Sequence, residues 1–433
     1  MDILTINDQI GVLPQSYYAD TANTDILHPT AQGDLKCDIC VIGGGFTGLS
    51  SALHLAKKGF DVVLLDAHRV GWGASGRNGG QMAGGQRVDQ DELEKLVGLD
   101  HARELWQLSL DSVALVHSLI NAHDIDCGFK PGILHADHKA KFVAGSHAYV
   151  DKMRDQYGYE GLRFVDRAEM REMIGTGAYF GGSLDSGSGH LHPLNFALGL
   201  AKAAISAGVR IFDQSRVTDI EHKSPAIVHT SAAKITADFV VMGCNGYVGE
   251  LESKVANNVM PINNYILATE PLSDDLASEL IRDDVAVADS KFVINYYRLS
   301  QDKRLLFGGT ESYRYRFPKD IGAAVSKPML EIYPQLKNAR IDYAWGGTLG
   351  VTMNRMPHFA RLAGNILSAS GFSGHGVAMG TLAGRIMADA VAGQAGDFDI
   401  MAKVPTPRFP GGSAFRWPLL VLAMTWFSLR DRI

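Results

Sequence analysis

The feature that most constrains the fold is a glycine-rich turn between a predicted strand and a predicted helix. Residues 43–48 spell GGGFTG, which matches the pattern G-x-G-x-x-G, and they follow an apolar strand-like stretch at 37–42. A helical stretch at 49–58 and a second apolar stretch at 61–65 complete a βαβ unit. The glycines allow a tight turn and the close approach of a pyrophosphate, which the helix N-terminus attracts. The sequence therefore predicts a parallel sheet that binds a dinucleotide.

The residues after the second strand indicate which dinucleotide. Asp66 ends that strand, at a position where a carboxylate accepts hydrogen bonds from ribose hydroxyls. The loop at 71–81 then spells GWGASGRNGGQ, a run of small residues and amides that could lie along a flat ring system. Because an NAD site needs no such loop, the loop favours FAD over NAD.

The rest of the chain predicts a second sheet. A single long helix is expected over roughly 91–122, and the later strand-like segments do not alternate with helices. The predicted fold class is α/β plus α+β, with a discontinuous Rossmann-like FAD-binding domain and a second, mostly antiparallel substrate domain. The predicted boundaries are an irregular arm on the surface at 1–35, the FAD-binding domain at 36–95, 190–248 and 345–395, the substrate domain at 96–189 and 249–344, and an extension with an apolar helix at 396–433.

Charge and cysteine content narrow the function. The formal net charge is −6 and no run of lysine or arginine is present, so we predict no nucleic-acid partner. The N-terminus has neither a basic region nor an apolar core typical of a secretory signal, so we expect a cytoplasmic protein. Cys37 and Cys40 form a C-x-x-C within an apolar strand, without a second Cys or His pair, and we predict no metal site.

The motifs resemble those of the D-amino-acid-oxidase-like family of FAD-dependent amine oxidoreductases, and within it the branch of γ-glutamylputrescine oxidoreductases. That branch carries the sequence ASGRNGG after the second strand, as this chain does at 74–80. The resemblance extends over about 36–391. Further matches follow in family order: NYYR at 295–298, RLLFGG at 304–309, WGG at 345–347, RMP at 355–357 and GFSGHG at 371–376.

The resemblance also implies which residues hold FAD. It places the adenosine ribose on Asp66, the adenine near the backbone of Val217, and the flavin pyrimidine beside 371–376, where N–H donors stabilise negative charge on the reduced flavin. The implied FAD-binding residues are Gly43, Gly45, Phe46, Thr47, Gly48, Asp66, Ala67, Gly73, Ala74, Ser75, Arg77, Asn78, Gly79, Gly80, Gln81, Val217, Gly347, Gly371, Phe372, Gly374, His375 and Gly376.

Four residues are candidates for catalysis or substrate binding. We predict that His375 contacts the flavin as a ring donor rather than transferring protons, although a histidine beside glycines can also simply fill space. Strand alternation sends Tyr296 and Arg298 to one face and Tyr297 to the other. Aromatic rings could wall an amine slot and Arg298 could anchor a distant carboxylate, so Tyr297 and Arg298 join His375 as catalytic candidates and all three strand residues are substrate-binding candidates. Ordinary sheet packing explains the strand residues equally well.

Two departures from relatives are informative. Relatives that bind flavin covalently use a cysteine before the last strand or a histidine in the loop after the second strand. This chain has no cysteine at 345–361 and no histidine at 71–81. We therefore predict non-covalent FAD. Sarcosine-oxidase relatives have a lysine after Gly-His-Gly that holds the α-carboxylate of the substrate, whereas residues 377–379 here are VAM.

The resemblance implies the oxidation of an amine. The α-hydrogen leaves as hydride to flavin N5, the imine hydrolyses to aldehyde and ammonia, and oxygen reoxidises the flavin to give peroxide; γ-glutamylputrescine or a similar polyamine-derived amine is the expected substrate. One alternative is an oxidase or dehydrogenase of a cyclic or secondary amino acid, pipecolate- or sarcosine-like, that passes electrons to a respiratory acceptor. Another is a flavin-binding subunit without turnover.

The C-terminal segment at 415–427 carries about a dozen apolar residues, too few to span a bilayer. We expect it to dock on the protein itself or on a partner subunit rather than to rest on a membrane surface, although peripheral contact with the inner membrane stays an alternative.

Overall fold

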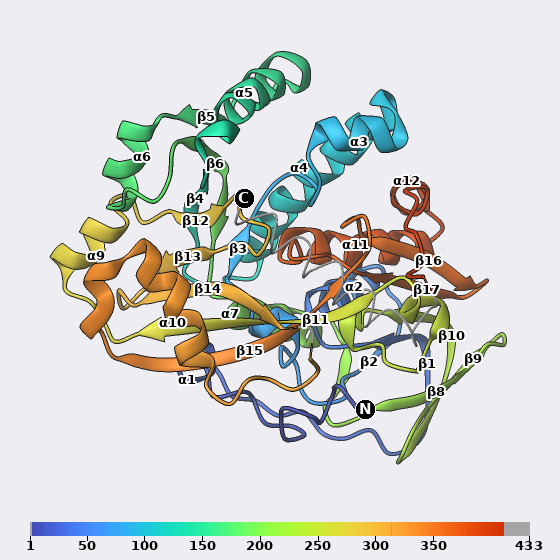
Figure 1. The fold of residues 1–433 in the computed structure, drawn as a ribbon. Coiled ribbons are helices and arrows are strands. Elements are labelled where there is room, and N and C mark those ends of the chain that lie inside the picture. The colour runs from blue at the N-terminus through green and yellow to red at the C-terminus, as the bar shows by residue number, and fades with distance from the viewer. Residues whose placement is uncertain (1, 313, 411–433) are drawn as a thin grey trace.

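The computed structural model describes residues 2–312 and 314–410. Their strands form two sheets, an eight-stranded sheet A and a nine-stranded sheet B, which lie on opposite sides of the view in Figure 1. The strands of sheet A are β1 (Gly33–Ile42), β2 (Val62–Leu65), β7 (Arg210–Phe212), β8 (Val217–Glu221), β9 (Ala226–Thr230), β10 (Ala233–Met242), β16 (His358–Ala363) and β17 (Ile366–Ser370).

Sheet A has the parallel core that the βαβ pattern predicts. Its order is β16-β17-β10-β1-β2-β7, and the five strands from β17 to β7 are parallel to one another. All four residues of β2 are buried, because both faces of the sheet are covered. Helices α2 (Phe46–Lys57), α7 (Pro193–Ser206) and α11 (Ala378–Val391) share one apolar core with one face of the sheet. The β8–β9 hairpin and α8 (Ser253–Ala256) contribute to the core on the other face.

Sheet B confirms the prediction of a second, mostly antiparallel sheet. Its order is β15-β11-β14-β13-β12-β4-β6-β3, with β5 paired to β6, and β12–β4 is the only parallel pair among the described strands of this sheet. Helices α6 (Arg167–Ile174), α9 (Asp274–Leu280) and α10 (Ile321–Ile332) share its outer core. The strands are β3 (Gln81–Met82), β4 (Lys130–Ala136), β5 (Leu162–Val165), β6 (Gly182–His190), β11 (Met260–Thr269), β12 (Ala286–Asp289), β13 (Tyr296–Leu299), β14 (Leu305–Ser312) and β15 (Ile341–Val351).

The prediction of one long helix over 91–122 is wrong. The segment forms two helices, α3 (Gln90–Val97) and α4 (Leu99–Ala122), separated by Gly98. Gly98 has a φ of 84°, a conformation that ends the first helix and that a residue with a side chain rarely adopts. The remaining helices are α1 (Tyr17–Asp20), α5 (Val143–Tyr157) and α12 (Gly396–Ala402), with short 3-10 turns at Ala74–Gly76, Ala140–Phe142, Asn245–Tyr247 and Pro334–Asn338.

The N-terminal arm is irregular apart from α1 and the start of β1 and is mostly exposed or half-buried, as expected, but it also buries Ser16, Tyr17, Tyr18 and Ala31. Tyr18 is fully buried and its ring meets that of Trp345 edge to face at a centroid distance of 5.2 Å. Asp8 forms an ion pair with Arg77 of the predicted flavin loop, with an oxygen-to-nitrogen distance of 3.1 Å. The arm therefore belongs to the framework of the site.

The domain boundaries stay a prediction. Strand β15, at 341–351, belongs to sheet B and crosses the predicted boundary at 345, so residues 345–351 pair with the sheet of the predicted substrate domain. Within the described residues, the helices are too short or too polar to cross a membrane. The apolar segment at 415–427 lies outside the described residues.

Candidate FAD and substrate site

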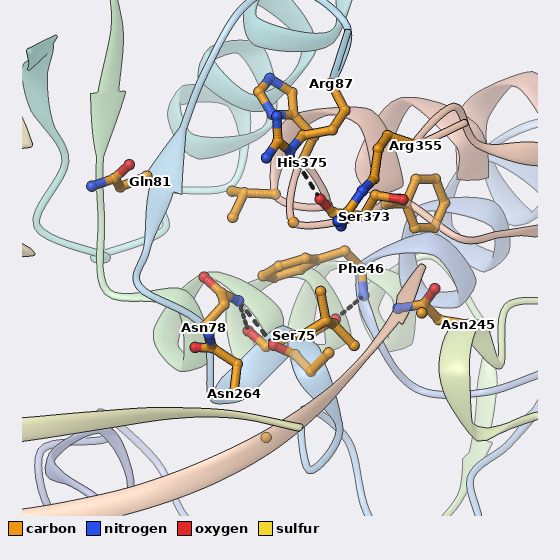
Figure 2. Close-up of a pocket in the computed structure, with 18 of the residues that line it drawn as sticks. Phe46, Ser75, Asn78, Gln81, Arg87, Asn245, Asn264, Arg355, Ser373 and His375 are labelled. Carbon is orange, nitrogen blue, oxygen red and sulfur yellow. Dashed lines mark hydrogen bonds between the residues drawn. The ribbon is translucent and has the colours of Figure 1, made fainter. Parts of the chain in front are cut away.

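A cavity of about 1310 Å³ is lined by residues from both sheets. Pockets for single small ligands usually measure about 300–1,000 Å³, so this cavity has room for a dinucleotide and a second small molecule. Residues of the turn after β1, the loop after β2 and the turn before α11 line it together. Figure 2 shows a close-up of this cavity.

Nearly all residues predicted to bind FAD line this cavity. The exceptions are Gly48, Gly80 and Gly371, which shape the backbone behind it. A Cβ atom on Gly48 would lie 1.8 Å from the carbonyl oxygen of Gly43, so this glycine allows α2 to pack against the end of β1. Gly80 and Gly371 both have a positive φ, 75° and 79°.

The turn between β1 and α2 presents unshielded backbone to the cavity. The N-cap of α2 is Gly45, which has no side chain to cap the first helical turn. A Cβ atom on Gly45 would lie 2.8 Å from Ser75 Oγ, and that same Oγ accepts a hydrogen bond from the N–H of Phe46 at 3.0 Å. A turn without side chains at a helix N-terminus is suited to binding a diphosphate.

Asp66 holds this turn in place. Its Oδ2 accepts a hydrogen bond from the N–H of Gly44 and its Oδ1 one from the N–H of His68, both at 2.7 Å. Burial raises the pKa of Asp66 to about 6, although both backbone hydrogen bonds lower it. Val217 also lines the cavity, and its contact with the adenine stays a prediction.

The loop after β2 is fixed by its own polar side chains. The Nδ2 atom of Asn78 donates to the carbonyl oxygens of Ala74 and Ser75 at 3.0 and 2.9 Å, as Figure 2 shows. Arg77 is 3% exposed, and its Nε donates to the carbonyl oxygen of Trp72 at 2.6 Å. The side chains of Arg77 and Asn78 therefore shape the loop, and the small residues on either side of them, at 73–76 and 79–80, add little side-chain bulk.

The three strand candidates occupy different places. Tyr296 lines the cavity, where its hydroxyl donates to Asn264 Oδ1. Its ring packs against the loop after β2, since a Cβ atom on Gly79 would lie 2.6 Å from it. Tyr297 points to the opposite face, as alternation predicts, and is 1% exposed in the outer core, stacked on Phe307. The structure does not bring Tyr297 to the cavity.

Arg298 supports the loop after β2 instead of lining the cavity. Its Nε donates to the carbonyl oxygen of Gly79 at 2.8 Å and its Nη2 to that of Leu191 at 2.9 Å. The predicted role of Arg298 as an anchor for a distant carboxylate is therefore corrected: its donors already hold backbone carbonyls, because the side chain turns beneath the loop.

The sequence did not predict several of the residues that line the cavity. They include Arg87, His135, Asn264, Glu311 and Arg355. Arg355 lies within the RMP match at 355–357, but the match assigned it no role. Glu311 and Asn264 are polar residues in or next to predicted strands, which is only a weak indication of a site. No spacing rule brings the two together, since they meet only through the β11–β14 pairing.

The family follows from comparison with known proteins. The family model described as FAD dependent oxidoreductase, abbreviated DAO, matches residues 38–390. The chain belongs to this family. The resemblance inferred from the motifs is thereby confirmed, and the DAO fold explains why one sheet carries the dinucleotide turn and the other completes the cavity.

Similar proteins and a solved structure agree with this assignment. Gamma-glutamylputrescine oxidoreductase of Escherichia coli (strain K12) is 41% identical over 419 residues, which cover 96% of this chain and 98% of the relative. The probable oxidoreductase OrdL of Rhizobium meliloti (strain 1021) is 40% identical over 96% of this chain and 97% of its own length. Glycine oxidase from Geobacillus kaustophilus has a similar solved fold, with a TM-score of 0.70, 21% identity and coverage of 83% of this chain and 95% of that chain.

The cavity fits the FAD on which this DAO protein depends. The positions that face the predicted diphosphate are glycines whose Cβ atoms would meet other atoms: a Cβ on Gly44 would lie 3.1 Å from Asp66 Oδ2. The turn after β1, the Asp66 carboxylate and the loop after β2 all line one cavity, which is larger than a single small ligand requires. Residues 43–47 would hold the diphosphate, Asp66 the ribose, and 73–79 together with 372–376 the flavin ring.

Proposed function

We propose that this oxidoreductase uses non-covalently bound FAD to oxidise the primary amine of γ-glutamylputrescine or a similar polyamine-derived amine. Oxygen is the proposed electron acceptor. The overall reaction converts R-CH2-NH2, oxygen and water into R-CHO, ammonia and hydrogen peroxide. FAD supplies the two-electron oxidant, and the protein binds and orients the amine and excludes bulk water.

The observation that carries this proposal is the acidic wall of the cavity beyond the predicted flavin loop. The aspartates Asp89, Asp137, Asp185 and Asp289 all line it. Carboxylates concentrated on one wall attract cationic ligands and disfavour anionic ones. An amine that carries a second positive charge, or a polar chain with a net positive charge, suits this wall better than a simple amino acid does.

Aromatic rings accompany the carboxylates. Trp106 and Tyr159 line the cavity edge to face, with ring centroids 5.2 Å apart, and the Tyr159 hydroxyl donates to Asp185 Oδ1 at 2.5 Å. Aromatic faces next to carboxylates bind ammonium groups through cation–π attraction. The same rings offer apolar surface to the methylene chain of a polyamine-derived substrate.

Non-covalent attachment is supported by the thiols of the site. Cys244 is the cysteine that lines the described part of the cavity, at its nucleotide end. Burial raises the pKa of Cys244 to about 12, so the thiol is protonated at neutral pH and is a poor nucleophile. Denaturation of the purified protein is expected to release FAD into the supernatant; flavin that stays with the precipitated chain would contradict this part of the proposal.

One experiment tests the function. The visible spectrum of the purified protein is recorded, and γ-glutamylputrescine, putrescine and proline are then added anaerobically in separate samples. We expect flavin bands that γ-glutamylputrescine bleaches, and stoichiometric peroxide when air is admitted. Bleaching by proline alone, with dye reduction but little peroxide, would instead support the alternative of an amino-acid dehydrogenase. Full FAD occupancy without bleaching by any amine would overturn the proposal.

A further inference from the structure

Three charged side chains line the cavity without pairing with one another. They are Arg87, after β3; Arg355, before β16; and Glu311, near the end of β14. Within residues 2–312 and 314–410, no ion pair includes any of them, and the Glu311 carboxylate has no hydrogen bond. All three residues are half-buried in the cavity wall, and a partly desolvated charge is stabilised by an opposite charge or by hydrogen bonds. The compensating groups are therefore expected to come from a ligand.

The two arginines are held in place by other contacts. The Nε atom of Arg87 donates to the carbonyl oxygen of Ser373 at 3.1 Å, which leaves its two terminal nitrogens for another partner. The guanidinium carbon of Arg355 lies 5.8 Å from the ring centroid of Phe292. Figure 2 shows both arginines on the side of the cavity that carries Ser373 and His375, with Asn264 on the opposite side.

The three charges act on one another across the cavity. Burial raises the pKa of Glu311, while the positive charges of Arg355 and Arg87 oppose that rise. Burial and the neighbouring Arg355 both lower the pKa of Arg87. The groups are thus close enough to interact but too far apart to pair, and a space lies between two positive groups and one negative group.

These charges are adjacent to the predicted flavin site. Arg87 is bonded to the turn at 371–376. Glu311 is directly opposite Asn264 in the β11–β14 pairing, and Asn264 accepts the hydrogen bond of Tyr296. The ring of Tyr296 packs against Gly79 of the loop after β2. A ligand between the three charges would therefore lie in the substrate part of the cavity and not in its nucleotide part.

We propose that Arg87 and Arg355 bind the carboxylate, and Glu311 the ammonium, of an α-amino-acid head group at the non-reacting end of the substrate. A zwitterion is the ligand whose charges complement two guanidinium groups and one carboxylate. The inference rests on the proposed function and assigns the residues that recognise the amino-acid part of its substrate. A free diamine gains nothing from the two arginines, because both of its charges are positive.

The test compares two substrates with the same reacting end. γ-Glutamylputrescine and N-acetylputrescine both present an aminobutyl amide, but only the former carries the zwitterionic head group. We expect R355M and R87M each to raise KM for γ-glutamylputrescine at least about tenfold, as the loss of a charged hydrogen bond implies. Because Arg87 also bonds Ser373, only R355M is expected to change kcat/KM for N-acetylputrescine by less than about threefold. R355K is expected to restore part of the affinity, since it returns the charge without the planar fork.

Two controls make the outcome specific. Arg103 lies exposed on α4, and R103M removes a guanidinium group without affecting the cavity. The FAD content of every variant is measured from its visible spectrum, so that loss of cofactor is not mistaken for loss of substrate affinity. Equal losses with both substrates in R355M, or a wild-type protein that does not discriminate between the substrates, would overturn the head-group site.

A binding measurement separates this inference from the proposed function. γ-Glutamyl-n-butylamide carries the head group but no reacting amine, and its binding is followed by the shift of the flavin spectrum. We expect R355M and E311Q to weaken its Kd at least about fivefold, even if no amine were turned over. Bleaching of the flavin by free glutamate, lost in R355M, would place the reacting nitrogen on the head group itself and would overturn the assignment to the non-reacting end.

Discussion

The Nε2 atom of His375 lies 3.1 Å from the carbonyl oxygen of Gly84. Because a carbonyl oxygen only accepts, Nε2 carries the hydrogen. Burial lowers the pKa of His375 to about 4, so the ring is neutral at pH 7 and its Nδ1 has no hydrogen to donate. The predicted role of His375 as a ring donor to the flavin would therefore require this bond to break. The geometry favours a positioning role, in which the turn before α11 is tied to the loop after β3.

The positioning role of His375 predicts a difference between two substitutions. In H375Q the amide nitrogen can still donate to Gly84, whereas H375L leaves that carbonyl without a donor. We expect H375L to lower the free energy of unfolding by about 1 kcal/mol and H375Q by less, as measured by urea denaturation. The pH dependence of turnover between pH 6 and 9 is expected to be the same in H375Q as in the wild type. Loss of a titration in that range from H375Q would indicate proton transfer instead.

We expect the free energy of unfolding to fall in mild acid, because burial lowers the pKa of several histidines. Burial lowers the pKa of His190 and of His192 to about 3, with the charge of Arg298 adding to the effect, and that of His375 to about 4. In the unfolded chain the histidines take up protons near pH 6.5, whereas in the folded chain they stay neutral at that pH. The contribution of the neutral histidines to the free energy of unfolding is therefore complete above pH 6.5 and is lost as the pH falls toward 4. Each histidine adds up to about 1.4 kcal/mol per pH unit in this window.

Two carboxyl groups oppose this trend in part. Burial raises the pKa of Asp66 and of Asp289 to about 6, so below pH 6 the folded chain binds protons that the unfolded chain does not. The protons of these three histidines outnumber those of the two aspartates, which leaves a net loss of stability of about one proton's slope, or about 1.4 kcal/mol per pH unit, from pH 6 to 5. Thermal unfolding from pH 8 to 5 measures it, and H375Q is expected to reduce the slope. A melting temperature that rises as the pH falls from 6.5 would contradict this account.

What the sequence could predict depends on how local the interaction is. The turn at 43–48 and Asp66 were predictable because strand, turn, helix and second strand are consecutive, and their contacts follow from the βαβ geometry. The grouping of Arg87, Glu311 and Arg355 was not, since Arg87 lies more than 200 residues from the other two in the sequence and no spacing rule brings such residues together. Arg298 shows a third case: strand alternation predicted its face correctly, but only the backbone carbonyls around it determine what its donors bind.

The ion pair between Asp8 and Arg77 predicts that the N-terminal arm stabilises the flavin loop. The side chain of Arg77 is 2% exposed and that of Asp8 15%, so D8A leaves a buried guanidinium group short of a partner. We expect a loss of about 3 kcal/mol in the free energy of unfolding, together with a lower FAD content after purification. E92A, which breaks the pair between Glu92 and Lys95, both more than 60% exposed, is the matched control and is expected to cost less than about 0.5 kcal/mol. Equal effects of D8A and E92A would show that the arm does not support the loop.

Gly48 predicts the most severe loss of cofactor binding. A Cβ atom at this position would lie 1.8 Å from the carbonyl oxygen and 3.0 Å from the carbonyl carbon of Gly43, both of which are backbone atoms that cannot rotate away. In G48A the first turn of α2 must therefore move off the end of β1, which displaces the N–H groups that would face the diphosphate. We expect a destabilisation of about 3 kcal/mol or more and little FAD in the purified protein, measured by thermal unfolding and by visible absorbance.

The matched control for G48A is G396A. Gly396 begins α12, has no positive φ, and a Cβ atom there would meet nothing within 4 Å. Alanine is therefore expected to leave FAD content unchanged and to stabilise the chain slightly, by up to about 1 kcal/mol, because it restricts the unfolded state and favours the helix. If G48A instead retained FAD with wild-type stability, α2 could shift without disturbing the turn. The close packing of α2 on β1 would then not be required for the diphosphate site.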